Sequence, residues 1–321
     1  MMTLSKIAKL ANVSVSTASK AFSGSTEVSE ETRQLVFRVA KEHGCFKKFY
    51  KAEYSKLVIA IIAPEFQSAY YTRYLSYIQN ALKERNCELC VSSTNFSAEQ
   101  EKDLVEYYEK YADVDGIIVI DSLLEKKEKC EVATVYVNYE KLDENIFSIS
   151  KDARPAMKES VAYLLEKGVT DIGFIGELRT DGKERALWEI LQQNGITPQA
   201  DFFCISDGRF EEGGYQAMET LFARGRLPRA IICAYDYMAI GAIRCINDHG
   251  LSVPEDVAIL GMDDIAGAAY LNPPLASISL RTQETCEMIV DMILGRINGD
   301  NEPKQKHIDS VFCLRRSFEI D

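Results

Sequence analysis

The chain of 321 residues is longer than one typical domain and long enough to bury a substantial core. Its hydrophobic fraction of 46% and charged fraction of 27% are those of a soluble globular protein. Because the longest apolar runs have the length of strands and no signal peptide is recognisable, we expect a cytoplasmic protein without a membrane segment.

The charge is distributed unevenly along the chain. Residues 1–56 carry ten cations and five carboxylates, a net charge of +5, so the formal net charge of −12 leaves −17 on the remainder. A basic N-terminal segment on an acidic body favours a DNA-binding head, because the body itself does not attract nucleic acid. Chance unevenness is the alternative interpretation.

Residues 3–23 predict two short helices joined by a tight turn. Thr3 is placed to cap the first helix and Ser14 to cap the second, which runs to about Phe22. The outward face of the second helix is short, hydroxyl-rich and carries one cation, which suits the floor of a DNA major groove. A helical hairpin with a solvated face is the alternative. The outward residues are Val15, Ser16, Thr17, Ser19 and Lys20.

A third helix is predicted to begin after Val28 and to end at Gly44. Residues 45–56 are basic and aromatic, without glycine or proline. They are interpreted as a linker that becomes helical only on DNA, because their net charge disfavours an isolated fold; an extension of the third helix is the alternative. The buried stripe of the third helix is expected to be Leu35, Val36, Val39 and Ala40.

From Leu57 onward, strand and helix patterns alternate. Such alternation predicts an α/β fold of parallel sheets with helices on both faces, and the length suits two sheets with a switch near residue 150. The predicted strands are 57–63, 88–92, 116–120, 132–137, 172–175, 202–205, 230–234 and 257–261, and the predicted helices are 71–85, 98–111, 155–167, 183–194, 211–224 and 237–249.

Ligands of such folds bind outside the carboxyl ends of the strands, which places them in a cleft between two lobes. Tyr70 and Tyr71 follow the first strand and are candidates for stacking on a sugar ring or a base, with core packing as the alternative. Arg185, near the start of a helix, is placed to donate two hydrogen bonds to a ligand, unless it is a surface residue.

Two more strand ends carry acidic residues. Tyr235 and Asp236 follow strand 230–234, and we expect Asp236 to cap the next helix. Asp263 and Asp264 follow strand 257–261. One of these two carboxylates is expected to face the cleft and accept hydrogen bonds from ligand hydroxyls, while the other holds the turn.

No catalytic or metal site is expected. Cys87 and Cys90 form a Cys-x-x-Cys within a strand, where such positions point to opposite faces, and only His43, His249 and His307 are available to assist the nine cysteines. Buried apolar thiols are therefore the expectation. Because motifs for a nucleophile, a metalloprotease or a dinucleotide are missing from the sequence, we expect neither an enzyme nor a cofactor.

The chain resembles, nearly end to end, the lactose/galactose repressor family of bacterial transcription regulators. Each matching motif is weak alone, but their order along the chain is specific. The motifs are Val13-Ser14 and Thr17-Ala18-Ser19-Lys20 in a helix-turn-helix at 3–22, Val28-Ser29 with Thr32-Arg33, Gly241-Ala242, Val253-Pro254-Glu255-Asp256-Val257, Gly261-Met262-Asp263-Asp264, Pro274-Leu275 with Ile278, and Leu314-Arg315-Arg316-Ser317.

The resemblance implies roles for particular residues. Val15, Ser16 and Lys20 stand at the base-reading positions of the family. Its phosphate-contacting positions fall on Thr3, Ser14, Thr17, Ser19, Ser29 and Thr32. Its effector-binding Arg and Asp fall on Arg185 and Asp263, with Phe210 near the aromatic wall of the cleft and Tyr235 beside the contact position at the end of its strand.

The resemblance also implies a two-lobed core like that of periplasmic sugar-binding proteins, in which the chain crosses between lobes near residues 150, 280 and 305. The expected segments are a helix-turn-helix head at 1–44, a hinge at 45–56 and an effector-binding and dimerisation core at 57–321. Within that core, the first lobe comprises 57–150 and 281–305, and the second comprises 151–280 and 306–321.

Three departures from the family pattern stand out. Lys47-Lys48 replaces the Pro-Asn of the hinge, and in place of the usual leucine wedge we expect Tyr54 to enter the minor groove. Ser150-Lys151 replaces Asp-Asn at the lobe crossing, which leaves the effector contacts there open. Lys20 in place of arginine keeps the charge but loses the fork that reads guanine.

The expected function is a ligand-responsive repressor of a carbohydrate-utilisation operon. It is expected to bind a palindromic operator as a homodimer, rather than a tetramer because no heptad extension follows the core, with a sugar or sugar phosphate as effector. A purine-responsive regulator is one alternative. The other is a cytosolic solute-binding sensor that no longer reads DNA.

Overall fold

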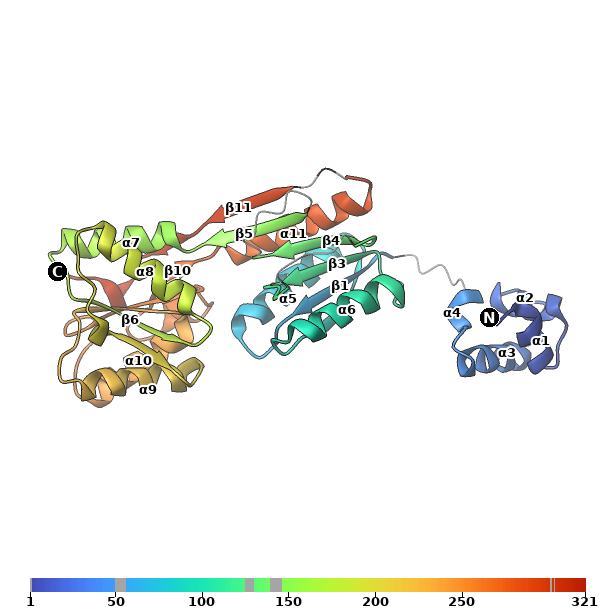
Figure 1. Cartoon of the computed structure of the whole chain (residues 1–321), viewed down its shortest axis with the longest axis horizontal. Coiled ribbons are helices and arrows are strands. Elements are labelled where there is room, and N and C mark those ends of the chain that lie inside the picture. Colours follow the sequence, from blue (N-terminus) through green and yellow to red (C-terminus); the bar gives the residue numbers. More distant parts are fainter. Residues whose placement is uncertain (1, 50–55, 125–129, 139–145, 301, 303) are drawn as a thin grey trace. The chain divides into compact units, whose positions relative to one another are not determined.

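The computed structural model describes residues 2–49, 56–124, 130–138, 146–300, 302 and 304–321. The chain forms two compact units, Met1–Leu57 and Val58–Asp321 (Figure 1). In the described residues, no helix is both long and apolar enough to cross a bilayer.

The first unit consists of short helices around one apolar core. As predicted, Ser14 caps the second helix, because its Oγ accepts a hydrogen bond from the backbone N–H of Thr17 at 2.9 Å. Thr3 and Ser29 cap the first and third helices in the same way. The helices are α1 (Leu4–Leu10), α2 (Val15–Phe22), α3 (Glu30–Glu42) and α4 (Phe46–Phe49).

Two expectations for this unit are corrected. Leu35 is 41% exposed, whereas Phe37 is buried and stacks on Phe22 with ring centroids 5.6 Å apart. The predicted linker begins with the helix α4, whose Phe46 meets the Phe37 ring edge-on at 4.9 Å. Aromatic packing therefore adds this segment to the core of the head. Tyr54, the predicted wedge, lies outside the described residues.

The second unit contains two six-stranded sheets. The first has the order β11-β5-β4-β3-β1-β2 and is parallel throughout; the second has the order β12-β10-β9-β8-β6-β7 and is parallel except for β12. The strands are β1 (Val58–Ala63), β2 (Glu88–Ser93), β3 (Gly116–Ile120), β4 (Ala133–Val137), β5 (Phe147–Asp152), β6 (Ile172–Glu177), β7 (Phe203–Ser206), β8 (Ala230–Cys233), β9 (Ala258–Met262), β10 (Ala276–Ser279), β11 (Gln305–Asp309) and β12 (Val311–Cys313).

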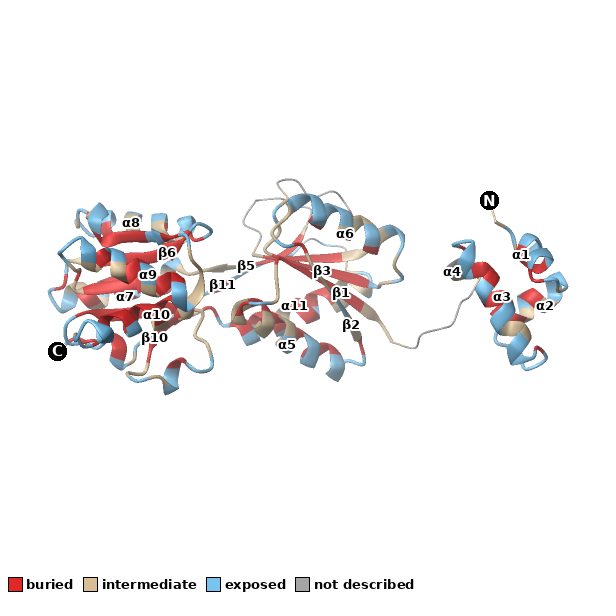
Figure 2. Cartoon of the chain, turned by 90° about the horizontal axis from the view of Figure 1, so that it is seen from below, coloured by how far each residue is buried: buried red, intermediate tan, exposed pale blue. Residues whose placement is uncertain are grey.

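Helices cover both faces of each sheet, and the central strands are buried, as the predicted α/β fold requires (Figure 2). In the first lobe, α6 lies on one face and α5 with α11 on the other. In the second lobe, α7 and α8 lie opposite α9 and α10 (Figure 1). The helices are α5 (Ala69–Glu84), α6 (Ala98–Lys110), α7 (Arg154–Glu166), α8 (Asp181–Gln193), α9 (Phe210–Ala223), α10 (Asp236–Asp248) and α11 (Thr282–Ile297).

The chain passes between the two sheets three times. It leaves the first sheet after β5, returns after β10 through α11, and crosses again at Ser310 between β11 and β12. The third crossing therefore lies beyond the predicted point near residue 305, because β11 pairs with β5 in the first sheet.

Candidate ligand and DNA-binding sites

A cleft of about 1000 Å³ lies between the two lobes, at the carboxyl ends of strands from both sheets. Its volume is at the upper end of the range of roughly 300–1000 Å³ for small-molecule sites. The structure brings together here all the predicted effector-binding residues: Tyr70, Tyr71, Arg185, Phe210, Tyr235 and Asp263.

The wall of the cleft in the first lobe is a hydrogen-bonded polar group. Nδ2 of Asn138 donates to the Tyr70 hydroxyl and to Oδ1 of Asp121, both at 2.6 Å. Burial raises the pKa of Asp121, although hydrogen bonds from Asn138 and Tyr71 oppose this rise. Asp121 and Asn138 directly follow β3 and β4. Polar residues after the carboxyl ends of strands are candidates for the cleft, as Tyr70 is, so the sequence offered a signal for both.

Lys151, at the end of β5, extends into the cleft. Its Nζ is buried, has no hydrogen-bond partner among the residues that the structure describes, and lies 4.9 Å from the centre of the Tyr70 ring and 4.6 Å from that of Tyr74. Burial lowers the pKa of this ammonium to about 8, although Asp121 and Asp263 favour its charged form. The sequence marked Lys151 as a departure from the family but did not predict its place beside the tyrosines.

Asp263 and Asp264 have the two different roles that the sequence predicts, one in the cleft and one in the turn. Asp263 lines the cleft, and its buried Oδ1 accepts no hydrogen bond from any residue that the structure describes. Asp264 instead accepts a hydrogen bond from Nη2 of Arg315 at 2.7 Å, and its backbone N–H donates to Ser277. Arg73 of the first lobe donates to the carbonyl oxygens of both residues, at 2.7 and 2.8 Å, and so joins the lobes at this turn.

Asp236 does not cap α10, contrary to the prediction. The N-cap position is Tyr235, and the carboxylate of Asp236 points inward, where it accepts hydrogen bonds from the Ile265 backbone at 2.7 Å and from Ser277 Oγ at 2.6 Å. Burial raises the pKa of Asp236 to about 7. Asp236 holds the turn after β9 from the buried side, because the Ile265 backbone N–H and the Ser277 hydroxyl supply the donors that a helix N-terminus would otherwise supply.

Backbone strain concentrates at the cleft. Of the ten described non-glycine residues with positive φ, five line it: Phe96, Asp121, Asn138, Phe210 and Asp263. Such conformations cost free energy and persist where the surrounding structure imposes them, which is common at binding sites.

The arginines of the second lobe occupy different parts of the cleft. Arg185 has a side chain that is 72% exposed and pairs with Asp181 at 2.9 Å. The guanidinium of Arg179 lies 4.2 Å from the centre of the Phe96 ring, which belongs to the first lobe.

In total, six cations and six carboxylates line the described cleft. Because these charges balance, the cleft favours a polar ligand of little net charge.

The predicted DNA-contacting residues of the head remain accessible. All nine that the structure describes are exposed or half-buried, and Val15, at the start of α2, is 48% exposed. Lys20 forms an ion pair with Glu27, and both side chains remain largely exposed. Such surface pairs are weak, so Lys20 is free to exchange this partner for a base or a phosphate.

Two family models match the chain. Bacterial regulatory proteins of the lacI family match residues 3–45, and the periplasmic binding protein-like domain matches residues 161–318. The HTH-type transcriptional repressor PurR of Edwardsiella ictaluri is 27% identical over 321 residues, covering 95% of this chain and 93% of the relative. The HTH-type transcriptional regulator AscG of Escherichia coli is 26% identical over 339 residues, covering 99% and 98%.

Solved structures confirm the fold. A complex of the transcriptional regulator CelR with cellobiose has a TM-score of 0.70 at 24% identity, covering 99% of this chain and 100% of that one. The lac repressor dimer bound to operator and the anti-inducer ONPF has a TM-score of 0.74 at 21% identity, covering 99% of both chains.

Proposed function

Since the chain belongs to the lacI family of bacterial regulatory proteins and is a DNA-binding transcriptional repressor rather than an enzyme, we propose that a carbohydrate in its interlobe cleft controls its binding to an operator. The operator is palindromic, and the protein binds it as a homodimer that places one α2 in each of two major grooves. The regulated genes belong to carbohydrate utilisation.

The observation that carries the carbohydrate assignment is the set of unpaired polar atoms in the cleft. Within the described part of the chain, Lys151 Nζ is a buried donor without a partner, and Asp263 Oδ1 and Asn138 Oδ1 are buried acceptors without partners. A buried polar group without a partner costs roughly 1–3 kcal/mol, which a bound ligand recovers. Sugar hydroxyls both donate and accept, and the aromatic rings of Tyr70 and Phe210 offer apolar faces to a sugar ring.

A purine is the second candidate, because the same aromatic rings suit a flat base. The cleft volume of about 1000 Å³ accommodates either ligand. The carbohydrate is preferred because its hydroxyls both donate and accept, as Lys151 Nζ and Asp263 Oδ1 together require. A solute sensor that no longer reads DNA is disfavoured by the basic head with its exposed, hydroxyl-rich α2.

The proposed mechanism is a shift in lobe closure. Contacts that join the lobes, such as Arg73 with the carbonyl oxygens of Asp263 and Asp264, exist in this arrangement and change when the lobes separate. An effector that binds one degree of closure more tightly shifts the population by that difference in affinity, and the heads of the dimer respond to the shift.

The test is a thermal-shift panel of sugars, sugar phosphates and nucleobases on the full chain. An effector present at a hundredfold excess over its Kd stabilises the protein by about 2.7 kcal/mol. Trp188, on α8, supplies an independent fluorescence signal. Gel shifts with DNA from upstream of the gene test the operator. A sugar that stabilises the protein and changes the gel shift supports the proposal. If only nucleobases raise the melting temperature, the effector is a purine and the carbohydrate proposal is wrong.

A further inference from the structure

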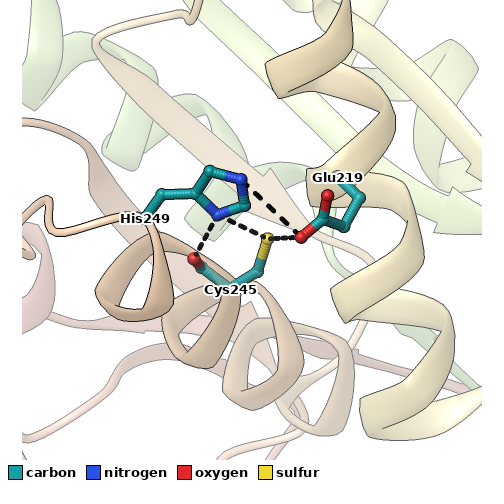
Figure 3. A group of neighbouring side chains, drawn as sticks. All are labelled: Glu219, Cys245 and His249. Atoms are coloured by element: carbon teal, nitrogen blue, oxygen red, sulfur yellow. Dashed lines mark hydrogen bonds and ion pairs between the residues drawn. The ribbon is translucent and has the colours of Figure 1, made fainter.

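A cluster of potential metal ligands lies at α9 and α10 (Figure 3), and its members differ from the residues that line the cleft. Glu219 comes from α9, Cys245 from α10, and His249 directly follows α10. Their ligand atoms all lie within 4.8 Å of one another. The regulatory function proposed above uses none of the three.

The packing of the two helices creates this cluster. Cys245 and His249 are four residues apart and therefore lie on the same face of a helix. Gly214 and Gly241 allow α9 and α10 to approach closely, because a Cβ at either position would come within 2.0 Å of a backbone oxygen of the other helix. The close approach brings Glu219 opposite the Cys245–His249 face.

Two of the distances between the ligand atoms approach those of a tetrahedral site. Sγ of Cys245 lies 3.5 Å from Oε1 of Glu219 and 3.8 Å from Nδ1 of His249, and Nε2 of His249 lies 3.7 Å from the same Glu219 oxygen. Zinc bonds of about 2.0 Å to nitrogen or oxygen and about 2.3 Å to sulfur require ligand separations of roughly 3.3–3.5 Å. The two separations that involve the Glu219 oxygen, 3.5 Å to Sγ and 3.7 Å to Nε2, are within a few tenths of an ångström of these values. The 3.8 Å separation from Sγ concerns Nδ1, so His249 must also shift to bring Nε2 toward the sulfur.

The histidine is already oriented for such a role. Its Nδ1 lies 3.0 Å from the Cys245 carbonyl oxygen, to which it donates in the tautomer that leaves Nε2 free toward Glu219. Its ring stacks on Phe222 with centroids 3.9 Å apart and planes at 9°. A hydrogen bond from the second ring nitrogen to a carbonyl is the usual support of a metal-binding histidine.

We propose that Glu219, Cys245 and His249 bind a divalent transition metal ion, with Zn²⁺ as the best fit. The ligand atoms are the Cys245 thiolate, Nε2 of His249 and a Glu219 oxygen, and a water molecule completes the tetrahedron. The thiol loses its proton to solvent as the sulfur–metal bond forms, so one proton is released for each ion bound near neutral pH. The ion connects α9 to α10 and stabilises the second lobe.

Cobalt titration of the metal-free full chain tests the site, because a cobalt–thiolate bond gives a near-ultraviolet charge-transfer band that cobalt bound only to nitrogen and oxygen lacks. We expect the band to saturate at one ion per chain and to disappear on addition of Zn²⁺. Cys90→Ser is the matched control, since Cys90 is an exposed cysteine on β2 and does not belong to this cluster.

The variants Cys245→Ser, His249→Gln and Glu219→Gln separate coordination from folding. Cys245→Ser is expected to abolish the band, and the other two, at exposed positions, to weaken cobalt binding at least tenfold without loss of fold. Zn²⁺ should raise the melting temperature of the wild type and of Cys90→Ser but not of His249→Gln. A wild type without the thiolate band, or a band that survives Cys245→Ser or is lost in Cys90→Ser, would overturn the proposal.

Discussion

Arg209 and Glu65 form a two-pronged ion pair across the cleft. Nη2 of Arg209 donates to Oε1 of Glu65 at 2.9 Å and Nη1 donates to Oε2 at 3.1 Å. Glu65 follows β1 in the first lobe, and Arg209 precedes α9 in the second. The side chains are only 11% and 27% exposed, so solvent screens the pair less than it would at the open surface. The pair therefore favours the degree of closure seen here.

Glu65→Gln should weaken this connection, because a neutral amide offers one acceptor oxygen instead of two charged ones. We expect the apparent affinity for the effector found in the panel to change by about threefold to tenfold, equivalent to roughly 1 kcal/mol, through the equilibrium of lobe closure. Titration of Trp188 fluorescence measures this change. Glu166→Gln, at an exposed site on α7, is the control. If Glu65→Gln and Glu166→Gln bind the effector with the same affinity, the Arg209–Glu65 pair does not contribute to the equilibrium of lobe closure.

The two adjacent aspartates should separate ligand binding from folding. Asp263→Asn is expected to remove most of the effector-induced rise in melting temperature, because the buried Oδ1 is then no longer a charged acceptor. Asp264→Asn is expected to cost about 1–3 kcal/mol of stability through its hydrogen bond with Arg315, while the effector-induced rise remains. Thermal shifts with and without effector compare the two. A full ligand response in Asp263→Asn would contradict the assignment of Asp263 to the cleft contact.

The alternating elements of the core could be read from the sequence because each is strongly patterned. The run that forms β1 is apolar throughout, and this pattern is typical of a strand buried on both faces. The strand β5 escaped prediction, since Ser148, Ser150 and Lys151 interrupt its apolar residues. Its stability comes from parallel pairing with β4 and β11, and β11 lies far along the chain, so no local pattern indicates it.

The candidate site was predictable only in part, for a similar reason. Strand ends indicated Tyr70 and Asp263, because carboxyl ends of parallel strands meet at one edge. The pairing of Arg209 with Glu65 depends on how the two lobes face each other. The order of strands and helices along the sequence does not specify that arrangement. The position of Asp236 at a helix start predicts a cap, but the Ile265 N–H and the Ser277 hydroxyl, which are distant in sequence, donate to its carboxylate instead.

Lys20 on α2 should contribute to sequence recognition. We expect Lys20→Ala to weaken operator binding by about 1–3 kcal/mol while non-specific binding weakens much less, because a base contact is lost in addition to a charge. Fluorescence anisotropy on operator and random DNA at equal salt measures both affinities. Lys102→Ala, at an exposed site on α6, removes the same charge from the other unit and should change neither. An equal loss on both DNAs would leave Lys20 as a phosphate contact.

Lys151 should make the stability of the second unit depend on pH in the alkaline range. Its pKa is about 8 in the folded protein and 10.5 when unperturbed, so between these values the unfolded chain binds more protons than the folded one. The contribution of this group to the free energy of unfolding therefore rises with pH across that window. Below pH 8 the lysine is charged in both states, and the burial of its ammonium lowers the free energy of unfolding by the full amount. Lys151→Met removes that cost.

We accordingly expect Lys151→Met to be more stable than the wild type at pH 7, by up to about 3 kcal/mol, because each unit of pKa shift corresponds to about 1.4 kcal/mol. The advantage should shrink steadily as the pH is raised from 8 to 10.5, since the wild-type lysine then becomes neutral in the folded state. Denaturant unfolding at a series of pH values measures the difference. Lys158→Met, at an exposed site on α7, controls for the loss of a lysine and should show no such trend. A difference between Lys151→Met and wild type that is constant with pH would mean that burial does not depress the lysine pKa.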